Sequence, residues 1–231
     1  MNIFGVSPLS VPPVERSDRQ LELLAAFEQL IAREGFRSLT VASIADRLHC
    51  SRSTLYELAP SKDALVELAV GRLLEGMVAA QRADAAQAAG PPEALAEFVR
   101  SSIRESSRFS RAYFVDVTEN PRCRTLLEQY NATCAGEMLA YIQAGMAAGD
   151  FRSDLNAVLA THAAMGAVAR MQDPRVLEAA GASYPEAIEH TFSLIVGGLR
   201  QGSDLGASTP RPKSNRPKNP ARTSPRPQHR R

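Results

Sequence analysis

The chain has 231 residues, 44% of them hydrophobic, with no tryptophan and few aromatic side chains. This length allows one large or two modest domains, and the core must be built mainly from Ala, Leu, Val, Ile and Met. No segment alternates β-branched and polar residues between turn signals, so the composition indicates an all-α protein. The net charge of +2 does not by itself indicate a nucleic-acid binder.

Targeting, membrane and metal signals are missing from the sequence. Three cysteines, Cys50, Cys123 and Cys134, have no CxxC or similar spacing, so free thiols are expected, with a redox role for Cys50 as the alternative. Residues 1–16 lack the basic start and apolar run of a secretory signal. No apolar run reaches the about 18 residues that span a bilayer. We therefore expect a soluble cytoplasmic protein.

Three closely spaced helix patterns follow a proline-containing leader, residues 1–16. Each pattern starts at a side chain that can cap a helix N-terminus: Ser17, Thr40 and Ser51. The first helix is expected to end at Gly35, and only His49 and Cys50 separate the second helix from the third. Two short helices joined by a tight turn after a longer helix describe a helix-turn-helix unit.

The third of these helices is the expected DNA-reading element. Apolar residues of the second and third helices should bury one face and hold the third helix in place. The opposite face then presents polar side chains to solvent: Arg52, Ser53 and Tyr56, with Thr54 beside them. An exposed helix of this size fits the DNA major groove, where Arg52 can bond a guanine or a phosphate. Lys62, at the start of the next helix, would add its charge to an anion site.

The rest of the chain is a series of helical patterns broken by glycine and proline. Ser61 is expected to cap a fourth helix from Lys62 to about Ala89, which the run from Gly90 to Pro92 ends. Further helices are expected over residues 93–107, 109–118, 122–148, 154–171 and 185–200. His162 lies among apolar residues of one of these patterns and is expected to be a core histidine rather than a ligand contact.

Basic residues gather at the end of the chain. Residues 206–231 contain six arginines, two lysines and no acidic residue, which leaves 19 basic against 25 acidic residues elsewhere. This Pro-, Arg- and Ser-rich tail, residues 203–231, is expected to be disordered because it cannot bury apolar surface. Two interpretations stay open: a solvated appendage, or a salt-sensitive, non-specific attachment to DNA.

Several short motifs stand in a particular order in the first third of the chain: Gly35-Phe36, Thr40, Ile44-Ala45, Ser51, Thr54-Leu55-Tyr56 and Ser61-Lys62-Asp63-Ala64-Leu65. In this order and spacing they resemble the tetracycline-repressor (TetR) family of bacterial regulators, over residues 17 to about 70. The resemblance implies a helix-turn-helix DNA-binding domain over residues 17–77 and a helical ligand-binding and dimerisation domain over residues 78–202. The implied DNA-binding residues are Thr40, Ser51, Arg52, Ser53, Thr54, Tyr56 and Lys62.

The chain departs from the family pattern in and around the third helix. His49 stands at the turn position that is usually glycine, and histidine is among the residues that best tolerate a left-handed backbone. Ser53 also replaces a frequent glycine, and Leu58 and Ala59 replace a usual aromatic pair. The backbone contacts made by that aromatic pair are therefore not carried over to this chain.

The resemblance also implies a mechanism. The last two major helices, 154–171 and 185–200, would pair with their copies in a homodimer, placing two reading helices about 34–36 Å apart on a palindromic double-stranded DNA operator. A small hydrophobic effector would bind among the middle helices and release the protein from DNA by shifting the fourth helix. The candidate pocket residues are Tyr113, Phe114, Met138, Tyr141 and Met165.

No enzyme motif is present. The sequence has no Gly-rich phosphate loop, no GxSxG and no HExxH, so we predict no catalytic residue, no cofactor and no metal site. A repressor located in the cytoplasm, at the nucleoid, is the favoured hypothesis. The alternative is a TetR-like adaptor or ligand-binding protein that does not bind an operator.

Overall fold

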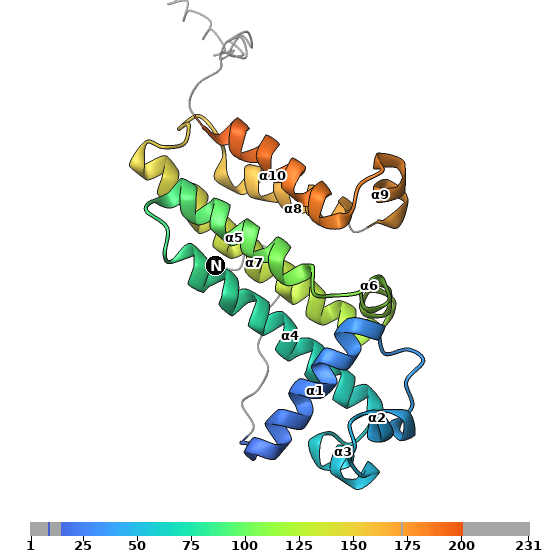
Figure 1. Cartoon of the computed structure of the whole chain (residues 1–231). Helices are drawn as coiled ribbons and strands as arrows, with labels where there is room; N and C mark the ends of the chain where they lie inside the picture. The colour runs from blue at the N-terminus through green and yellow to red at the C-terminus, as the bar shows by residue number, and fades with distance from the viewer. Residues whose placement is uncertain (1–8, 10–14, 172, 201–231) are drawn as a thin grey trace, which may run out of the picture. The chain divides into compact units, whose positions relative to one another are not determined.

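The computed structural model describes residues 9, 15–171 and 173–200, and this part of the chain is helical (Figure 1). The predicted all-α class is confirmed, because the described residues contain no strand and only one isolated bridge, between Phe151 and Arg200. The tail and most of the leader lie outside the described residues. The helices are α1 (Asp18–Glu34), α2 (Val41–Arg47), α3 (Arg52–Leu58), α4 (Lys62–Ala85), α5 (Pro91–Ser106), α6 (Arg111–Glu119), α7 (Pro121–Ala148), α8 (Ala157–Met171), α9 (Pro174–Ala180) and α10 (Tyr184–Leu199).

The first four helices begin at side chains that the sequence marks as caps: Ser17, Thr40, Ser51 and Ser61. In each case the side-chain oxygen accepts a hydrogen bond from the amide of the residue three positions later. In α1 and α2 the side chains of Gln20 and Ser43 also accept from the cap's own amide. Each cap stabilises its helix by about 1 kcal/mol, so local chemistry fixes where these helices start.

The turn between α2 and α3 requires a left-handed residue. His49 has a φ of 51°, and it is the only non-glycine residue with a positive φ in the described part of the chain. The amide of Cys50 then donates to the carbonyl of Ala45 at 3.0 Å, which closes the turn. Histidine tolerates this backbone better than most residues, so the replacement of glycine leaves the helix-turn-helix geometry intact.

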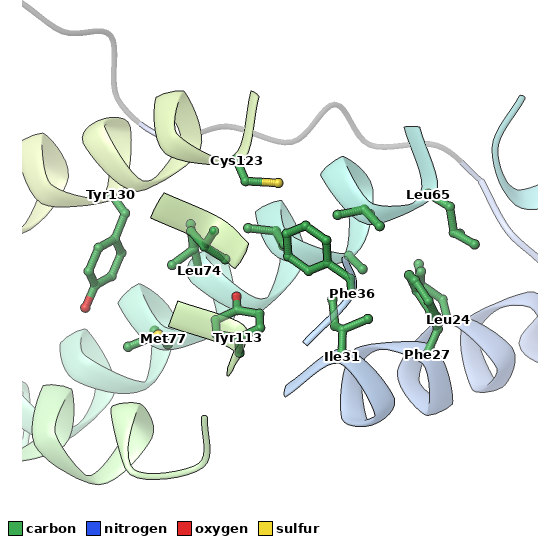
Figure 2. Close-up of a cluster of buried hydrophobic side chains, with 14 of the residues drawn as sticks. Leu24, Phe27, Ile31, Phe36, Leu65, Leu74, Met77, Tyr113, Cys123 and Tyr130 are labelled. Carbon is green, nitrogen blue, oxygen red and sulfur yellow. The ribbon is translucent and has the colours of Figure 1, made fainter. Parts of the chain in front are cut away.

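One buried cluster extends from the helix-turn-helix region into the remaining helices (Figure 2). Phe27 and Ile31 of α1 are fully buried and belong to the same cluster as Leu74 of α4, Tyr113 of α6 and Tyr130 of α7. Helix α4 crosses residue 77, the predicted boundary between the two functional halves. The two halves therefore share one helix and one core.

The helices after the helix-turn-helix region pack in layers. Helices α4, α5 and α7 pack against one another, and α8 and α10 pack together, α8 against α7 and α10 against α5 (Figure 1). The short helix α6 contacts both α1 and α7. Helix α6 is thus the element of the C-terminal half that lies against the first helix of the N-terminal half.

Proline starts two helices at places where the sequence analysis expected none. Helix α5 begins at Pro91, and α9, which was not predicted, begins at Pro174 after the capping side chain of Asp173. The amide that proline lacks would be unpaired in the first turn anyway. Reading these prolines only as breaks was wrong.

The largest other differences from the predicted helix limits are at the end of α4 and the start of α8. Helix α4 ends at Ala85 instead of about Ala89. Helix α8 begins at Ala157 instead of residue 154, because the side chain of Asn156 accepts from the amide of Leu159 and caps the helix there.

Candidate nucleic-acid interface and ligand cavity

Two buried leucines hold one face of helix α3 against the rest of the domain, and the opposite face is exposed. Leu55 and Leu58 are 2% and 7% exposed, whereas Tyr56 is 52% exposed and Arg52 and Ser53 are also exposed. Arg52 makes no hydrogen bond or ion pair with the other described residues, so its guanidinium is available to an external anion. The predicted polar face is therefore present.

Three hydroxyl groups organise the start of α3. The hydroxyl of Ser51 lies 2.6 Å from that of Ser53 and 2.8 Å from that of Thr54, and it accepts from the Thr54 amide at 3.1 Å. Thr54 is half-buried. These contacts fix the N-terminal turn of α3, and the side chains of Arg52 and Tyr56 on this helix are exposed to solvent.

Thr40 and Lys62, the other predicted DNA-binding residues, lie at the starts of α2 and α4. Thr40 is exposed and forms a reciprocal pair of hydrogen bonds with Ser43. Lys62 is half-buried, and its ammonium donates to the carbonyl of Arg37 at 3.3 Å. The structure thus joins Lys62 to the turn between α1 and α2, and a phosphate contact by this residue stays a prediction.

Asp116 of α6 connects the C-terminal half to that same turn. Its carboxylate is nearly buried and accepts from the backbone amides of Phe36 at 2.6 Å and Arg37 at 2.8 Å. The Arg37 guanidinium lies 3.5 Å from the other carboxylate oxygen and also pairs with Glu119. The sequence analysis missed this contact, because no local pattern joins residues about 80 positions apart.

Two further features hold α6 to the end of α1. The amide of Ser110, which caps α6, donates to the carbonyl of Ala32 at 2.8 Å. Gly35 has a φ of 76°, and a Cβ atom there would lie 2.5 Å from a carboxylate oxygen of Asp116. A glycine is therefore needed for both its backbone conformation and the close approach of Asp116.

A cavity of about 70 Å³ lies among α4, α5, α6, α7, α8 and α10. Four of the five predicted pocket residues line it: Tyr113, Phe114, Met138 and Met165. Tyr141 does not line it and instead packs on Phe98, with ring centroids 5.7 Å apart. The structure thus gathers the four residues around one space, and their contact with an effector stays a prediction.

The sequence analysis missed most of the cavity wall. Ser102 of α5 and Tyr130, Asn131 and Cys134 of α7 all line the cavity. Helical spacing along α7 provides a signal, because Leu127, Tyr130, Asn131 and Cys134 stand at positions i, i+3, i+4 and i+7, which share one helix face. Spacing alone does not reveal this wall, because the same periodicity describes a solid core.

A buried polar group lies beside the cavity. Gln81 of α4 is 0% exposed, and its side-chain amide donates to the hydroxyl of Tyr130 at 2.6 Å. The thiol of Cys134 donates to the side-chain oxygen of Gln81 at 3.5 Å. Burial raises the pKa of the Cys134 thiol to about 12. It raises the pKa of the Cys123 thiol to about 12 as well, so both thiols stay protonated at neutral pH.

Helices α8 and α10 present an apolar face to solvent in the single chain. Leu159 of α8 is 66% exposed and Leu194 of α10 is 79% exposed. A Cβ atom added at Gly166 would meet nothing within 4 Å. His162 is also exposed, so its predicted place in the core was wrong: it lies on the outer side of α8.

Other kinds of site are not found in the described part of the chain. The three cysteines there are free, and no three His, Cys, Asp or Glu side chains come together as metal ligands. No helix among the described residues is both long and apolar enough to cross a bilayer.

Comparison with known proteins places the helix-turn-helix region in a family. Residues 23–69 match the family model for bacterial regulatory proteins of the tetR family. The chain is 27% identical over 162 residues to the HTH-type transcriptional repressor KstR2 of Rhodococcus jostii (strain RHA1), which covers 66% of this chain and 79% of that protein.

Solved structures share the fold at low sequence identity. A protein of Saccharomonospora viridis, assigned as a transcriptional regulator and solved with choline, has a TM-score of 0.67 at 21% identity and covers 81% of this chain and 100% of its own. A TetR transcription regulator of Haloarcula marismortui has a TM-score of 0.67 at 18% identity, over 80% of this chain and 100% of its own. The ketosteroid transcriptional regulator KstR2 of Mycobacterium tuberculosis has a TM-score of 0.51 at 19% identity, over 81% of this chain and 98% of its own.

Proposed function

Since the chain belongs to the TetR family of bacterial transcription regulators and is a DNA-binding regulator, we propose that it is a repressor that binds a palindromic operator as a homodimer. The observation that carries the proposal is the exposed face of α3, with Arg52 unpaired among the described residues and Tyr56 52% exposed. Residues 17–77 would read DNA, and residues 78–202 would bind an effector and the second copy. The protein would act at the nucleoid and would have no catalytic role.

Footprinting on DNA upstream of the chain's own gene and its neighbour tests operator binding. Arg52→Ala and Tyr56→Ala should each weaken binding to the protected sequence by about fivefold to 100-fold, because each removes a contact with a base edge or a phosphate. Arg100→Ala is the matched control: Arg100 is exposed on α5, outside the reading helix, and pairs with Glu97. If Arg52→Ala binds the operator as the unchanged protein does, the adaptor alternative is favoured.

The exposed face of α8 and α10 supports the homodimer. Exposed leucines on two adjacent helices, with glycines that let another backbone approach, form a surface suited to a helical bundle between two copies. Ala164 of α8 is fully buried, so it belongs to the core of the single chain and not to this face. Leu194→Glu should yield a monomer in light scattering, whereas Leu21→Glu on α1, which is 39% exposed, should leave the dimer intact.

The cavity and α6 support release by a small hydrophobic effector. The space of about 70 Å³ is smaller than the roughly 300–1,000 Å³ of common ligand sites, so a ligand of ordinary size must displace part of the wall. Tyr113 and Phe114 of α6 belong to that wall, and Asp116 of the same helix holds the turn before α2. Movement of α6, together with the predicted shift of α4, would change the position of the reading helix.

A coupling of about 1–3 kcal/mol between effector and DNA would weaken operator binding about 5-fold to 150-fold. A gel shift on the footprinted operator with a panel of small hydrophobic compounds measures this coupling. A compound that binds the protein tightly and leaves operator affinity unchanged argues against release by an effector in this cavity.

A further inference from the structure

The wall of the cavity is uncharged. No Asp, Glu, Lys, Arg or His is found among the described residues that line it. Charged residues on the surface of α4 and α7 pair with each other, as Arg82 of α4 does with Glu137 of α7. A charged group of a ligand would therefore enter this space without an opposite charge to meet it.

Burying an unpaired charge is costly. A carboxylate or an ammonium that leaves water needs a paired charge or several hydrogen bonds to compensate for lost hydration. The cavity offers hydroxyl, amide and thiol groups only, from residues such as Ser102, Asn131 and Cys134. An uncharged polar group can be satisfied there by one such partner, whereas a full charge would meet no opposite charge and would be buried at a higher cost.

Three aromatic residues of the wall pack against one another. The rings of Phe109 and Tyr113 stack on each other, with centroids 4.5 Å apart and planes 15° apart. Phe114 packs against both of them, with interplanar angles of 82° and 75°. A quaternary ammonium is recognised by ring faces turned toward one centre, and these three rings pack on one another instead.

Hydrogen-bonding capacity is left over in the wall. The side-chain amide of Asn131 is half-buried and makes no hydrogen bond with the other described residues. The hydroxyl of Ser102 has only a long contact, 3.5 Å, with the hydroxyl of Tyr130. The hydroxyl of Tyr113 is buried without a partner among the described residues. Buried polar groups in proteins are nearly always paired, so the buried Tyr113 hydroxyl indicates a missing polar partner. Asn131 and Ser102 are only half-buried, and they add unused hydrogen-bonding capacity to the wall.

Flexible side chains line part of the cavity. Three methionines, Met77, Met138 and Met165, contribute to its wall. A methionine side chain has three rotatable bonds, so it can repack around a guest. The cavity can therefore widen around a hydrocarbon molecule larger than its empty space of about 70 Å³.

We propose that the cavity takes an uncharged, mainly hydrocarbon molecule with a hydroxyl or carbonyl group, and that Asn131 and Ser102 hydrogen-bond that group. The proposal deepens, and rests on, the effector role proposed above. It separates this chain from any relative that holds a charged ligand, because the uncharged wall selects against carboxylates and ammonium groups of the same length.

Calorimetric titration of the full protein chain with three probes, each with an eight-carbon hydrocarbon chain, tests the charge selection. Octanol should bind at least about tenfold more tightly than octanoate and octyltrimethylammonium at neutral pH, because only the last two must bury an unpaired charge. Octanoate or octyltrimethylammonium binding as tightly as octanol overturns the proposal, and so does a failure of octanol to bind.

Substitutions on α7 test the polar contact. Asn131→Leu should weaken octanol binding about threefold to tenfold, the effect of one lost hydrogen bond. Asn131→Asp should reverse the preference and favour octyltrimethylammonium over octanol. Gln143→Leu, an exposed amide on the same helix, is the control and should change neither affinity. Unchanged octanol binding by Asn131→Leu overturns the assigned contact.

These titrations contain no DNA, so their outcome is separate from that of the proposed function. Octanol binding with the expected selectivity, together with no protected sequence in the footprint, supports the ligand class and contradicts the repressor. A clear footprint with binding of the charged probes supports the repressor and contradicts the ligand class.

Discussion

Replacing Asp116 tests the contact between the two halves of the chain. In Asp116→Ala, the amides of Phe36 and Arg37 lose the carboxylate oxygen that accepts from both, at 2.6 and 2.8 Å. Leaving a buried amide without an acceptor costs about 1–3 kcal/mol, so the loss of the acceptor for both amides should lower the free energy of unfolding by about 2–6 kcal/mol. For a folded part of this size, the melting temperature should drop by about 4–24 °C.

Two further variants show whether the carboxylate itself is responsible. In Asp116→Asn the side-chain amide oxygen can accept from the same two backbone amides, so only the negative charge that strengthens these hydrogen bonds is lost. The free energy of unfolding should therefore fall by an intermediate amount, about 1–2 kcal/mol. Glu119→Gln is the control on the same helix, because its pair with Arg37 is exposed to solvent and should add little stability.

Circular dichroism melts give the order of the three variants, and a gel shift gives the functional effect. Asp116→Ala should retain effector binding and lose most of the effector's influence on operator affinity, because α6 no longer holds the turn before α2. A melting temperature equal to that of the unchanged protein, or a larger loss in Glu119→Gln than in Asp116→Ala, would refute this reasoning.

Three more outcomes are expected from the buried residues. Gly145→Ala should lower the free energy of unfolding by about 1–3 kcal/mol, because the added Cβ would lie 2.3 Å from the ring of Phe151. The midpoint of urea unfolding should fall accordingly, and an unchanged midpoint would contradict this close packing. At pH 8 a thiol reagent should label the half-buried Cys50 first, and label Cys123 and Cys134 only after unfolding, as peptide mapping would show. Because burial raises the pKa of the last two from 9.0 to about 12, the folded state keeps protons that the unfolded state loses. The free energy of unfolding should therefore fall as pH rises from about 9 toward 12, and equal urea stability at pH 8 and pH 10 would count against it.

Local signals in the sequence were enough for the DNA-reading element. Ser17, Thr40, Ser51 and Ser61 act on amides three residues away, so the capping pattern shows where the helices start. The periodicity that places Leu55 inside leaves Arg52 and Tyr56 outside. A left-handed residue at His49 could also be predicted, because the tight turn requires one.

Periodicity was less informative for the C-terminal half. Nearly every helix there is rich in Ala, Leu, Val and Met, so apolar spacing does not distinguish a core face, a cavity wall and a face left open for a second copy. His162 and Tyr141 illustrate the ambiguity: the first is exposed, and the second packs on Phe98 outside the cavity.

The sequence by itself determined what depends on neighbours a few residues apart: the helix starts, the tight turn and the polar face of α3. Only the tertiary structure decided what depends on distant segments meeting, such as the carboxylate of Asp116 on the amides of Phe36 and Arg37 and the uncharged wall around Asn131. The physical reason is that a cap or a turn is stabilised within one stretch of backbone. A buried carboxylate or a cavity exists only after separate helices have packed, and their packing leaves no local pattern in the chain.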